Sequence, residues 1–414
     1  MPSSLLLLVV SLTSLVANVE SIHAPNSLTH NVQPSSIQSS TKSHGDIIQL
    51  REKLLQQFSH DMSKLQLLPV TKLTTPCHLI SKDTSNTKAW KLEDWDRHCA
   101  SSLERYTRHV RSWPRSTSTR SILPTVLLVL SWSTIILFAT SKYSPPIIAN
   151  LILQSSLSYG LIGTFLSPIA LLLSLRANQA LNRLMDVRKA WGQMSRSTRS
   201  LAGVIATYGV FAIQSNGEAK DNDAELMTTS FLAAKYLAIF GWCMKAAFRK
   251  DEDDTDIIRA VLPHPEADWL LSSPSKRPIA ILSRLRFLIQ QLSTSLEIPP
   301  MIHLTLEQRL YDLEASFGTC NRILMSPIPP TYTRHTSRVL CLFLFLLPLN
   351  FAGSKTSPLA LLLSVMIITY VLVGIDEIGL EIEHPFPLLP MQEMAATFQK
   401  NVENQFVLPR GVYS

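Results

Sequence analysis

The stretch that most constrains the fold of this chain runs from Phe165 to Gly203. It begins as an apolar run of the kind that crosses a lipid bilayer, and from Arg176 onward it carries arginine and lysine at frequent intervals. We expect one continuous helix that leaves the bilayer near Arg176. A chain with such a helix has one part in a membrane and another part outside it.

One face of this helix carries small or apolar side chains just before the charged part begins. Ser167, Leu171 and Leu175 recur at every fourth position, so they lie on the same side of a helix. Such a face can pack against a neighbouring helix or line a narrow pore. Helix packing is the commoner reason for this spacing, and the spacing alone leaves both interpretations open.

The composition indicates a membrane protein. Of the 414 residues, 46% are hydrophobic and only 17% are charged, and the apolar residues are concentrated in runs. The net charge of +7 comes mainly from residues beside these runs, which is typical of membrane topology rather than of nucleic-acid binding. We therefore expect membrane lipid as a partner and no nucleic acid.

The apolar runs predict an all-α membrane protein with four transmembrane helices. They lie at about 122–140, 157–175, 338–352 and 357–375. The loops inside the two hairpins carry only Lys142 and Lys355 as charged residues, whereas the outer flanks are basic. Because basic flanks stay on the side that is not translocated, both hairpins should begin and end on the same side, together with a helical body.

The first 45 residues resemble a targeting region. An apolar core from Leu5 to Leu15 is followed by small residues around Ala17 to Ala24, as in a signal peptide. The next segment, Ser21 to Gly45, contains no Asp or Glu and is rich in hydroxyl side chains, as in a transit peptide. The combination favours a plastid surrounded by extra membranes; the alternative is a secreted or endomembrane protein with a linker.

Residues 46–96 predict an amphipathic helix, Asp46 to Leu68, followed by a linker at about 75–87.

From Arg97 to Arg120 the chain concentrates arginine, with tryptophan nearby. Basic and aromatic residues together can bind single-stranded nucleic acid. Directly before an apolar span, they more often form a juxtamembrane anchor, which is the interpretation that we adopt.

The residues between the two hairpins predict a helical body outside the membrane. Ala224 to Phe248 is apolar enough to be buried on most faces, and 259–336 reads as helices separated by proline-rich turns. The acidic run Asp251 to Asp256 lacks the glycine and glutamate that an EF-hand requires, so we expect a solvated loop that caps the next helix. A last helix, 391–402, precedes a tail at 406–414.

The sequence contains no pattern that supports catalysis or a metal site. The histidines are scattered, the five cysteines form no CxxC pair, and no glycine-rich phosphate loop is present. An acidic cluster begins where the last apolar run ends: Asp376, Glu377, Glu381 and Glu383. We expect these carboxylates to pair with Arg334 or Arg338 at the membrane surface. We expect no enzyme activity and no cofactor; an intramembrane enzyme is the weaker alternative.

Three stretches resemble a known family in the order in which they occur. The first carries the pattern R-x-N-x-A-x-x-R-x-x-x-x-R-K-x-W-G at Arg176, Asn178, Ala180, Arg183, Arg188, Lys189, Trp191 and Gly192. The second, Ser326 to Leu340, includes Pro329, Tyr332 and Thr333. The third, Gly374 to Met394, includes Glu377, Pro385 and Phe386. Over about residues 100–405 the chain resembles the bestrophin-like anion channels, in particular the thylakoid voltage-dependent chloride channels.

The resemblance implies a bestrophin-like homopentamer with one axial pore, with a channel domain at 97–405. The family's neck rings match Ser167, Leu171 and Leu175, with Pro168 also in place. The implied cargo is chloride, bicarbonate or another monovalent anion, carried across the thylakoid membrane.

Two departures from the family pattern matter. The acidic run that follows proline-phenylalanine in calcium-gated animal members is absent after Pro385 and Phe386, so we expect no calcium gating of that type. Ser167 stands where a larger apolar residue is commoner, which leaves open a membrane scaffold or assembly protein that kept the fold and does not conduct.

Overall fold

The computed structural model describes residues 44–67, 91–99, 101–113, 116–142, 157–211, 222–249, 253–273, 276–352 and 357–407. All of these residues belong to one compact unit, Lys42–Ser414. Nearly all of the predicted targeting region, the linker at 75–87 and most of the C-terminal tail lie outside the described residues. Those that are described form helices joined by turns and loops, without a strand, so the expected all-α class is confirmed for this part of the chain.

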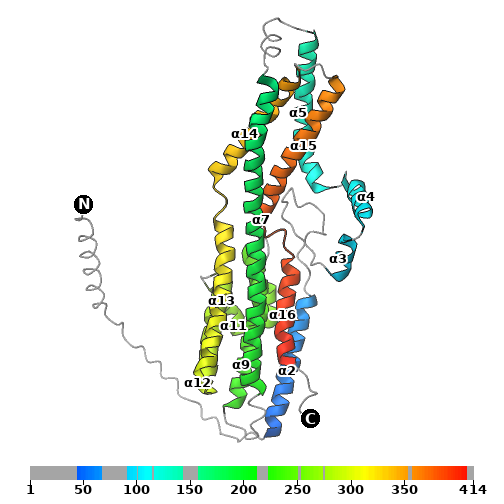
Figure 1. Cartoon of the computed structure of the whole chain (residues 1–414). Helices are drawn as coiled ribbons and strands as arrows, with labels where there is room; N and C mark the ends of the chain where they lie inside the picture. The colour runs from blue at the N-terminus through cyan, green and yellow to red at the C-terminus, as the bar shows by residue number, and fades with distance from the viewer. Residues whose placement is uncertain are drawn as a thin grey trace, which may run out of the picture. The chain divides into compact units, whose positions relative to one another are not determined.

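Helix α7, Leu157–Ala206, is a single helix of 50 residues and is followed by a π-helical turn, η2, at Thr207–Phe211. The predicted continuous helix from the apolar run into the basic segment is therefore confirmed. Figure 1 shows α7 running beside two groups of helices, and it packs against members of both. One group packs along its apolar half and the other packs along its basic half.

The group around the apolar half consists of α5 (Thr117–Lys142), α14 (Pro330–Ala352) and α15 (Pro358–Glu383). These helices contain the runs predicted at 122–140, 338–352 and 357–375. Together with α7 they enclose one hydrophobic cluster, which includes Ile122, Val126, Ile169, Leu173, Leu344 and Val365. Much of the remaining apolar surface of α5 and α15 is exposed, as expected of helices that face lipid.

Three helices of the described residues are long and apolar enough to cross a bilayer: α5, α15 and α9 (Asp223–Phe248). The apolar stretch of α9 is 83% buried inside the protein, against 28% and 33% for those of α5 and α15. A helix that is apolar on all sides is the expected core of a helical body. The prediction that Ala224 to Phe248 is a buried helix is therefore confirmed, while the count of four spans stays a prediction.

The group around the basic half forms the body. Helices α2 (His44–Leu67), α12 (Arg277–Ser295), α13 (Pro300–Met325) and α16 (Met391–Val407) share one hydrophobic core with α9. Two short helices, α10 (Thr255–Val261) and α11 (His264–Ser272), lie between α9 and α12 in sequence. Proline at the caps starts three helices: Pro263 before α11, Pro299 before α13 and Pro329 before α14. The predicted proline-rich turns are confirmed.

The amphipathic helix expected at Asp46 to Leu68 is α2, and it docks on the body. Its Asp61 pairs with Lys235 of α9 at 2.7 Å, and the backbone carbonyl of Met62 accepts a hydrogen bond from Gln399 of α16 at 2.8 Å. Two further helices, α3 (Leu92–His98) and α4 (Ser102–Ser112), contain no buried residue.

Candidate pore neck and the junction beside it

The apolar half of α7 has one covered face and one open face. Ile169 and Leu173 are each 1% exposed, because they belong to the cluster shared with α5, α14 and α15. Leu171 and Leu175 are 59% and 44% exposed, and Ser167 is exposed on the same side. The three residues that the spacing placed on one face therefore lie on a face that the described part of the subunit leaves uncovered.

Pro168 and Asn178 are also exposed. Pro168 lies inside the helix, where it cannot donate a backbone hydrogen bond to the preceding turn. A proline at this point bends or loosens a helix locally, so the open face contains a weak point of the α7 backbone.

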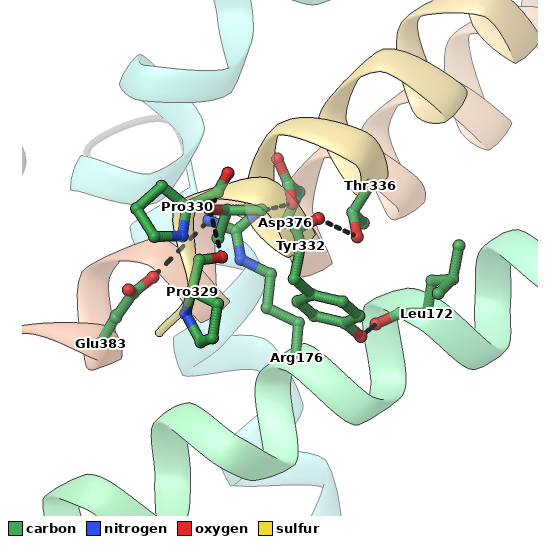
Figure 2. Close-up of polar contacts among 9 residues, drawn as sticks. Leu172, Arg176, Pro329, Pro330, Tyr332, Thr336, Asp376 and Glu383 are labelled. Atoms are coloured by element: carbon green, nitrogen blue, oxygen red, sulfur yellow. Dashed lines mark hydrogen bonds and ion pairs between the residues drawn. The ribbon is translucent and has the colours of Figure 1, made fainter. Parts of the chain in front are cut away.

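Arg176 stands where the apolar half of α7 ends, and its side chain is only 4% exposed. It forms ion pairs with Asp376 and Glu383 of α15, the second with 3.8 Å between Nη2 and Oε2 (Figure 2). A guanidinium that is buried between two hydrophobic clusters requires such counter-charges. The buried pair joins α7 to α15 at the boundary between the body and the group formed by α5, α14, α15 and the apolar half of α7, which we call the membrane group.

This arrangement corrects the prediction that the acidic cluster pairs with Arg334 or Arg338. Both arginines are exposed on α14, whereas Asp376 and Glu383 face Arg176 on α7. The sequence shows charges on several helix ends, and the packing of α15 along α7 decides which of them meet.

Two more hydrogen bonds join helices near Arg176. The hydroxyl of Ser121 on α5 donates to Glu377 at 2.9 Å, and the hydroxyl of Tyr332 on α14 donates to the backbone carbonyl of Leu172 at 2.9 Å (Figure 2). The hydroxyl of Thr333 donates to the carbonyls of Pro329 and Pro330, at 3.4 and 3.2 Å, inside the first turn of α14. The motif residues of α14 thus start this helix and attach it to α7.

Arg183 holds α7 against the end of α13. Its guanidinium donates to the backbone carbonyls of Ile323 at 2.6 Å and Ser326 at 2.7 Å, and more weakly to that of Glu383 at 3.3 Å. The last carbonyls of a helix have no partner within it and lie at the negative end of the helix dipole. A positively charged donor therefore suits this position.

The remaining motif residues fall into a buried and an exposed set. Trp191 is buried against Phe398, with ring centroids 5.5 Å apart, and Phe386 stacks on Phe248 at 4.9 Å. Pro385 is also buried. The exposed set is Arg188, Lys189 and Gly192. A side chain added at Gly192 would meet nothing within 4 Å, so the isolated subunit offers no steric reason for glycine there.

Comparison with known families decides how these observations fit together. The family model described as "Bacterial/Fungal Bestrophin protein" matches residues 98–404 of this chain. The chain belongs to the bestrophin family. The resemblance predicted from the three motif stretches is thereby confirmed, and the matched residues include the junction at Arg176 as well as the open face of α7.

Individual relatives of this bestrophin agree with the family. It is 27% identical over 390 residues to "Voltage-dependent chloride channel 2, chloroplastic" of Arabidopsis thaliana, covering 92% of this chain and 85% of that protein. It is 27% identical over 268 residues to a "Voltage-dependent anion channel-forming protein" of Nostoc, covering 63% of this chain and 83% of the relative. The crystal structure of a bestrophin homologue from Klebsiella pneumoniae, 22% identical, matches with a TM-score of 0.58 over 70% of this chain and 99% of that one, which shows the fold.

In this bestrophin the acidic run after α9 has a structural role. Asp253 accepts hydrogen bonds from the backbone and hydroxyl of Thr255, at 3.1 and 2.7 Å, and pairs with Arg277 at 3.2 Å. The hydrogen bond from the Thr255 hydroxyl and the nearby Arg277 hold the pKa of Asp253 below its usual value, although burial opposes them. The prediction of a solvated capping loop holds only in part: Asp253 binds the first turn of α10, whereas the N-cap residue Asp254 is buried, makes no side-chain capping hydrogen bond and pairs with Arg277. Asp251 and Glu252 lie outside the described residues. Within the described ranges, no group of three or more His, Cys, Asp or Glu could hold a metal ion.

One buried and one partly buried polar group of the body escaped the sequence analysis. Lys235 in α9 pairs with Asp61, and Glu266 in α11 binds both Tyr236 and Arg284. A lysine within an otherwise apolar helix was the available signal for the first, because a buried ammonium group requires a counter-charge. No comparable signal marked the second group.

Proposed function

We propose that this protein is a homopentameric anion channel with a single axial pore whose neck is lined by α7 from each subunit. The observation that carries the proposal is the open face of α7, on which Ser167, Leu171 and Leu175 are exposed while Ile169 and Leu173 are buried. Around a closed axis, these three positions would form stacked rings. Apolar rings control conduction by dewetting and still pass weakly hydrated anions.

The proposed subunit crosses the membrane four times, through α5, the first half of α7, α14 and α15. These four segments enclose one hydrophobic cluster that is distinct from the core of the body. The apolar part of α14 is short because Arg334 and Arg338 occupy its first turns. The ion pair of Arg176 with α15 marks the level at which the bundle leaves the lipid.

We further propose that the channel carries chloride or bicarbonate across the thylakoid membrane. Two relatives bear names that specify chloroplastic chloride channels, which supports a plastid membrane and an anion as cargo. Chloride would balance the charge moved by proton pumping, and bicarbonate would supply carbon fixation. Both anions are monovalent and similar in size, so the neck residues favour neither. No enzymatic step and no cofactor is part of this proposal.

The test is planar-bilayer recording of the purified full-length protein, after light scattering has established a pentamer. A chloride gradient should give a reversal potential that follows the anion, and replacing chloride by bicarbonate on one side should shift it according to the permeability ratio. A cation-selective current would contradict the proposal. A silent bilayer from verified pentamers, repeated at both polarities, would favour the non-conducting scaffold.

A further inference from the structure

A cavity of about 440 Å³ lies in the body between α11 and α12, which are helices other than those of the proposed neck. Three residues from each helix line it, and their spacing places them on one face of that helix: Pro265, Glu266, Trp269, Ser283, Arg284 and Phe287. Cavities that bind small molecules have this size and combine apolar walls with a few polar groups. We call this site the aromatic cavity.

The walls of the aromatic cavity are apolar and partly uncovered. Trp269 of α11 is 43% exposed and Phe287 of α12 is 60% exposed, so ring surface of both residues is available to a ligand. Pro265 adds a third apolar surface. Such walls favour a ligand with a planar ring, because contacts between rings add to the gain from burying apolar surface.

The polar end of the cavity is a guanidinium held in one orientation. Nε of Arg284 donates to Oε2 of Glu266 at 3.1 Å, and Nη2 pairs with Oε1 of the same carboxylate. The hydroxyl of Tyr236 on α9 donates to Glu266 at 2.6 Å and so fixes the carboxylate in turn. The guanidinium carbon of Arg284 also lies 5.2 Å from the centre of the Phe287 ring.

One edge of this guanidinium is free. Arginine carries five N–H groups in a planar fork, and the residues that the structure describes give Nη1 of Arg284 no hydrogen bond. Nη1 and the second hydrogen of Nη2 form an edge that matches a carboxylate, which accepts two parallel hydrogen bonds from such an edge. Glu266 already compensates the charge of Arg284, so a simple anion gains little here and a ring must supply the rest of the binding energy.

We propose that the aromatic cavity binds a small aromatic carboxylate. The carboxylate lies on the free edge of Arg284, and the ring lies against Phe287 and Trp269. Through Glu266 and Tyr236 the site is connected to α9, whose residues belong to the core of the body. The inference goes beyond the proposed channel, and it does not depend on whether the channel conducts.

The first experiment titrates 2-naphthoate into the full-length protein in nanodiscs and measures the heat, with empty nanodiscs as the blank. We expect one saturable site per subunit. Two further probes separate the halves of the ligand: 2-naphthalenemethanol keeps the ring and lacks the charge, whereas acetate keeps the carboxylate and lacks the ring. Each should bind about tenfold more weakly or worse, because each lacks one of the two sets of contacts.

The second experiment repeats the titration with matched pairs of variants. Arg284→Lys keeps a cation beside Glu266 and removes the guanidinium edge, so binding should weaken about tenfold. Arg286→Lys changes another arginine of α12 and should leave binding unchanged. Phe287→Leu removes an exposed ring and keeps an apolar side chain, and binding should weaken about fivefold. Its control, Tyr311→Leu, removes a ring of α13 that is 62% exposed and should have no effect.

A third experiment locates the bound ring with a photoreactive analogue, 6-azido-2-naphthoate. After illumination and proteolysis, the label should be found on peptides from α11 and α12. Excess 2-naphthoate present during illumination should prevent this labelling.

Four results would overturn the proposal. The first is a titration without a saturable heat. The second is equal binding of 2-naphthoate and 2-naphthalenemethanol, which would remove the role of Arg284. The third is an equal loss of affinity in the control variants. The fourth is labelling confined to the membrane group, which would place the ligand in the neck or in lipid.

Discussion

Arg176 on α7 and Asp376 on α15 form a largely buried ion pair across 200 residues of sequence, at the point where α7 leaves the membrane group and enters the body. Glu383 adds a second carboxylate at 3.8 Å. The pair lies between two hydrophobic clusters, and the side chains of Arg176 and Asp376 are only 4% and 19% exposed, so water is a poor substitute for either partner. The burial of each charge is therefore favourable only while the opposite charge is present.

Removing one partner of this pair should cost more than removing both. Arg176→Gln leaves two carboxylates without their cation, and we expect a loss of about 3–5 kcal/mol in the free energy of unfolding. Arg176→Gln/Asp376→Asn should lose less than the sum of the two single variants. Thermal unfolding in detergent, followed by tryptophan fluorescence, measures all three. Lys189→Gln is the control, because its exposed pair with Asp186 should contribute less than about 1 kcal/mol. Additive losses would contradict the coupling.

Leu175→Ala should enlarge the proposed neck. Shortening an exposed leucine on the open face of α7 widens the ring and weakens dewetting, so the single-channel current should rise severalfold. Leu128→Ala removes the same atoms from α5, which is not part of the proposed neck and where the leucine is 67% exposed, and it should leave the current unchanged. If Leu175→Ala changes neither the current nor its rectification, the constriction lies elsewhere.

The pair between Asp61 and Lys235 should hold α2 on the body. Asp61→Asn leaves the ammonium group of Lys235 buried without a counter-charge, at a cost of about 3 kcal/mol or more. Hydrogen exchange should then increase throughout α2. Lys64→Gln removes a cation that is 44% exposed from the same aspartate and should have little effect. Asp61→Asn/Lys235→Met should restore protection, since it removes both charges; failure of this rescue would contradict the role given to the pair.

Glu266 should make the stability of the body depend on pH. Its carboxylate accepts hydrogen bonds from Tyr236 at 2.6 Å and from Arg284 Nε at 3.1 Å. Burial alone would raise the pKa of Glu266, but these bonds outweigh it and hold the pKa below its usual value. A lowered pKa in the folded state stabilises the fold above the unfolded pKa, at about 4.3, and this stabilisation is lost as the pH falls through the folded value.

We therefore expect Glu266→Gln to lose about 1–3 kcal/mol at pH 7 and to approach the wild type as the solution is acidified. Thermal melts across this pH range measure the difference. Glu307→Gln is the control, because its partner Arg286 is 46% exposed. If the difference in unfolding free energy between the wild type and Glu266→Gln stays constant as the pH falls to the folded pKa, the carboxylate charge is not the source of the stabilisation.

Calcium should not gate the proposed channel through the segment after α15. Phe386, Leu389 and Met391 are each fully buried there in the core of the body, so the chain offers apolar side chains where a calcium site would need carboxylates. Open probability in bilayers should be the same with calcium and with excess chelator. A reversible loss of current on chelation would contradict this expectation.

The sequence predicts the helices of this protein better than their contacts. The apolar runs and the proline-rich turns located α5, α9 and α13–α15 because hydropathy and helix breaking are local properties. The spacing of Leu171 and Leu175 placed both on one face of α7, but it left open whether that face is covered by another helix. The ion pair between Arg176 and Asp376 could not be predicted from the sequence, because it depends on how α15 lies against α7. The same limit applies to Asp61 with Lys235, which are 174 residues apart.

The choice of spans shows a second limit. Hydropathy alone ranks α9 with α5 and α15, since all three are long and apolar. Burial separates them: α9 has protein on nearly every side, whereas the other two leave most of their apolar stretches exposed on the subunit. A sequence records how apolar a helix is, and the packing decides whether lipid or protein surrounds it.

The length of α7 has a mechanical consequence for the neck. At 50 residues it extends for about 75 Å, and its two halves belong to different hydrophobic clusters. A hydrogen-bonded helix resists twisting, so a rotation of the body about the axis of α7 turns Leu171 and Leu175 by a similar angle. In the proposed pentamer, a molecule that repositions the body would thus change which side chains face the pore axis from a distance, without a separate moving segment between the two.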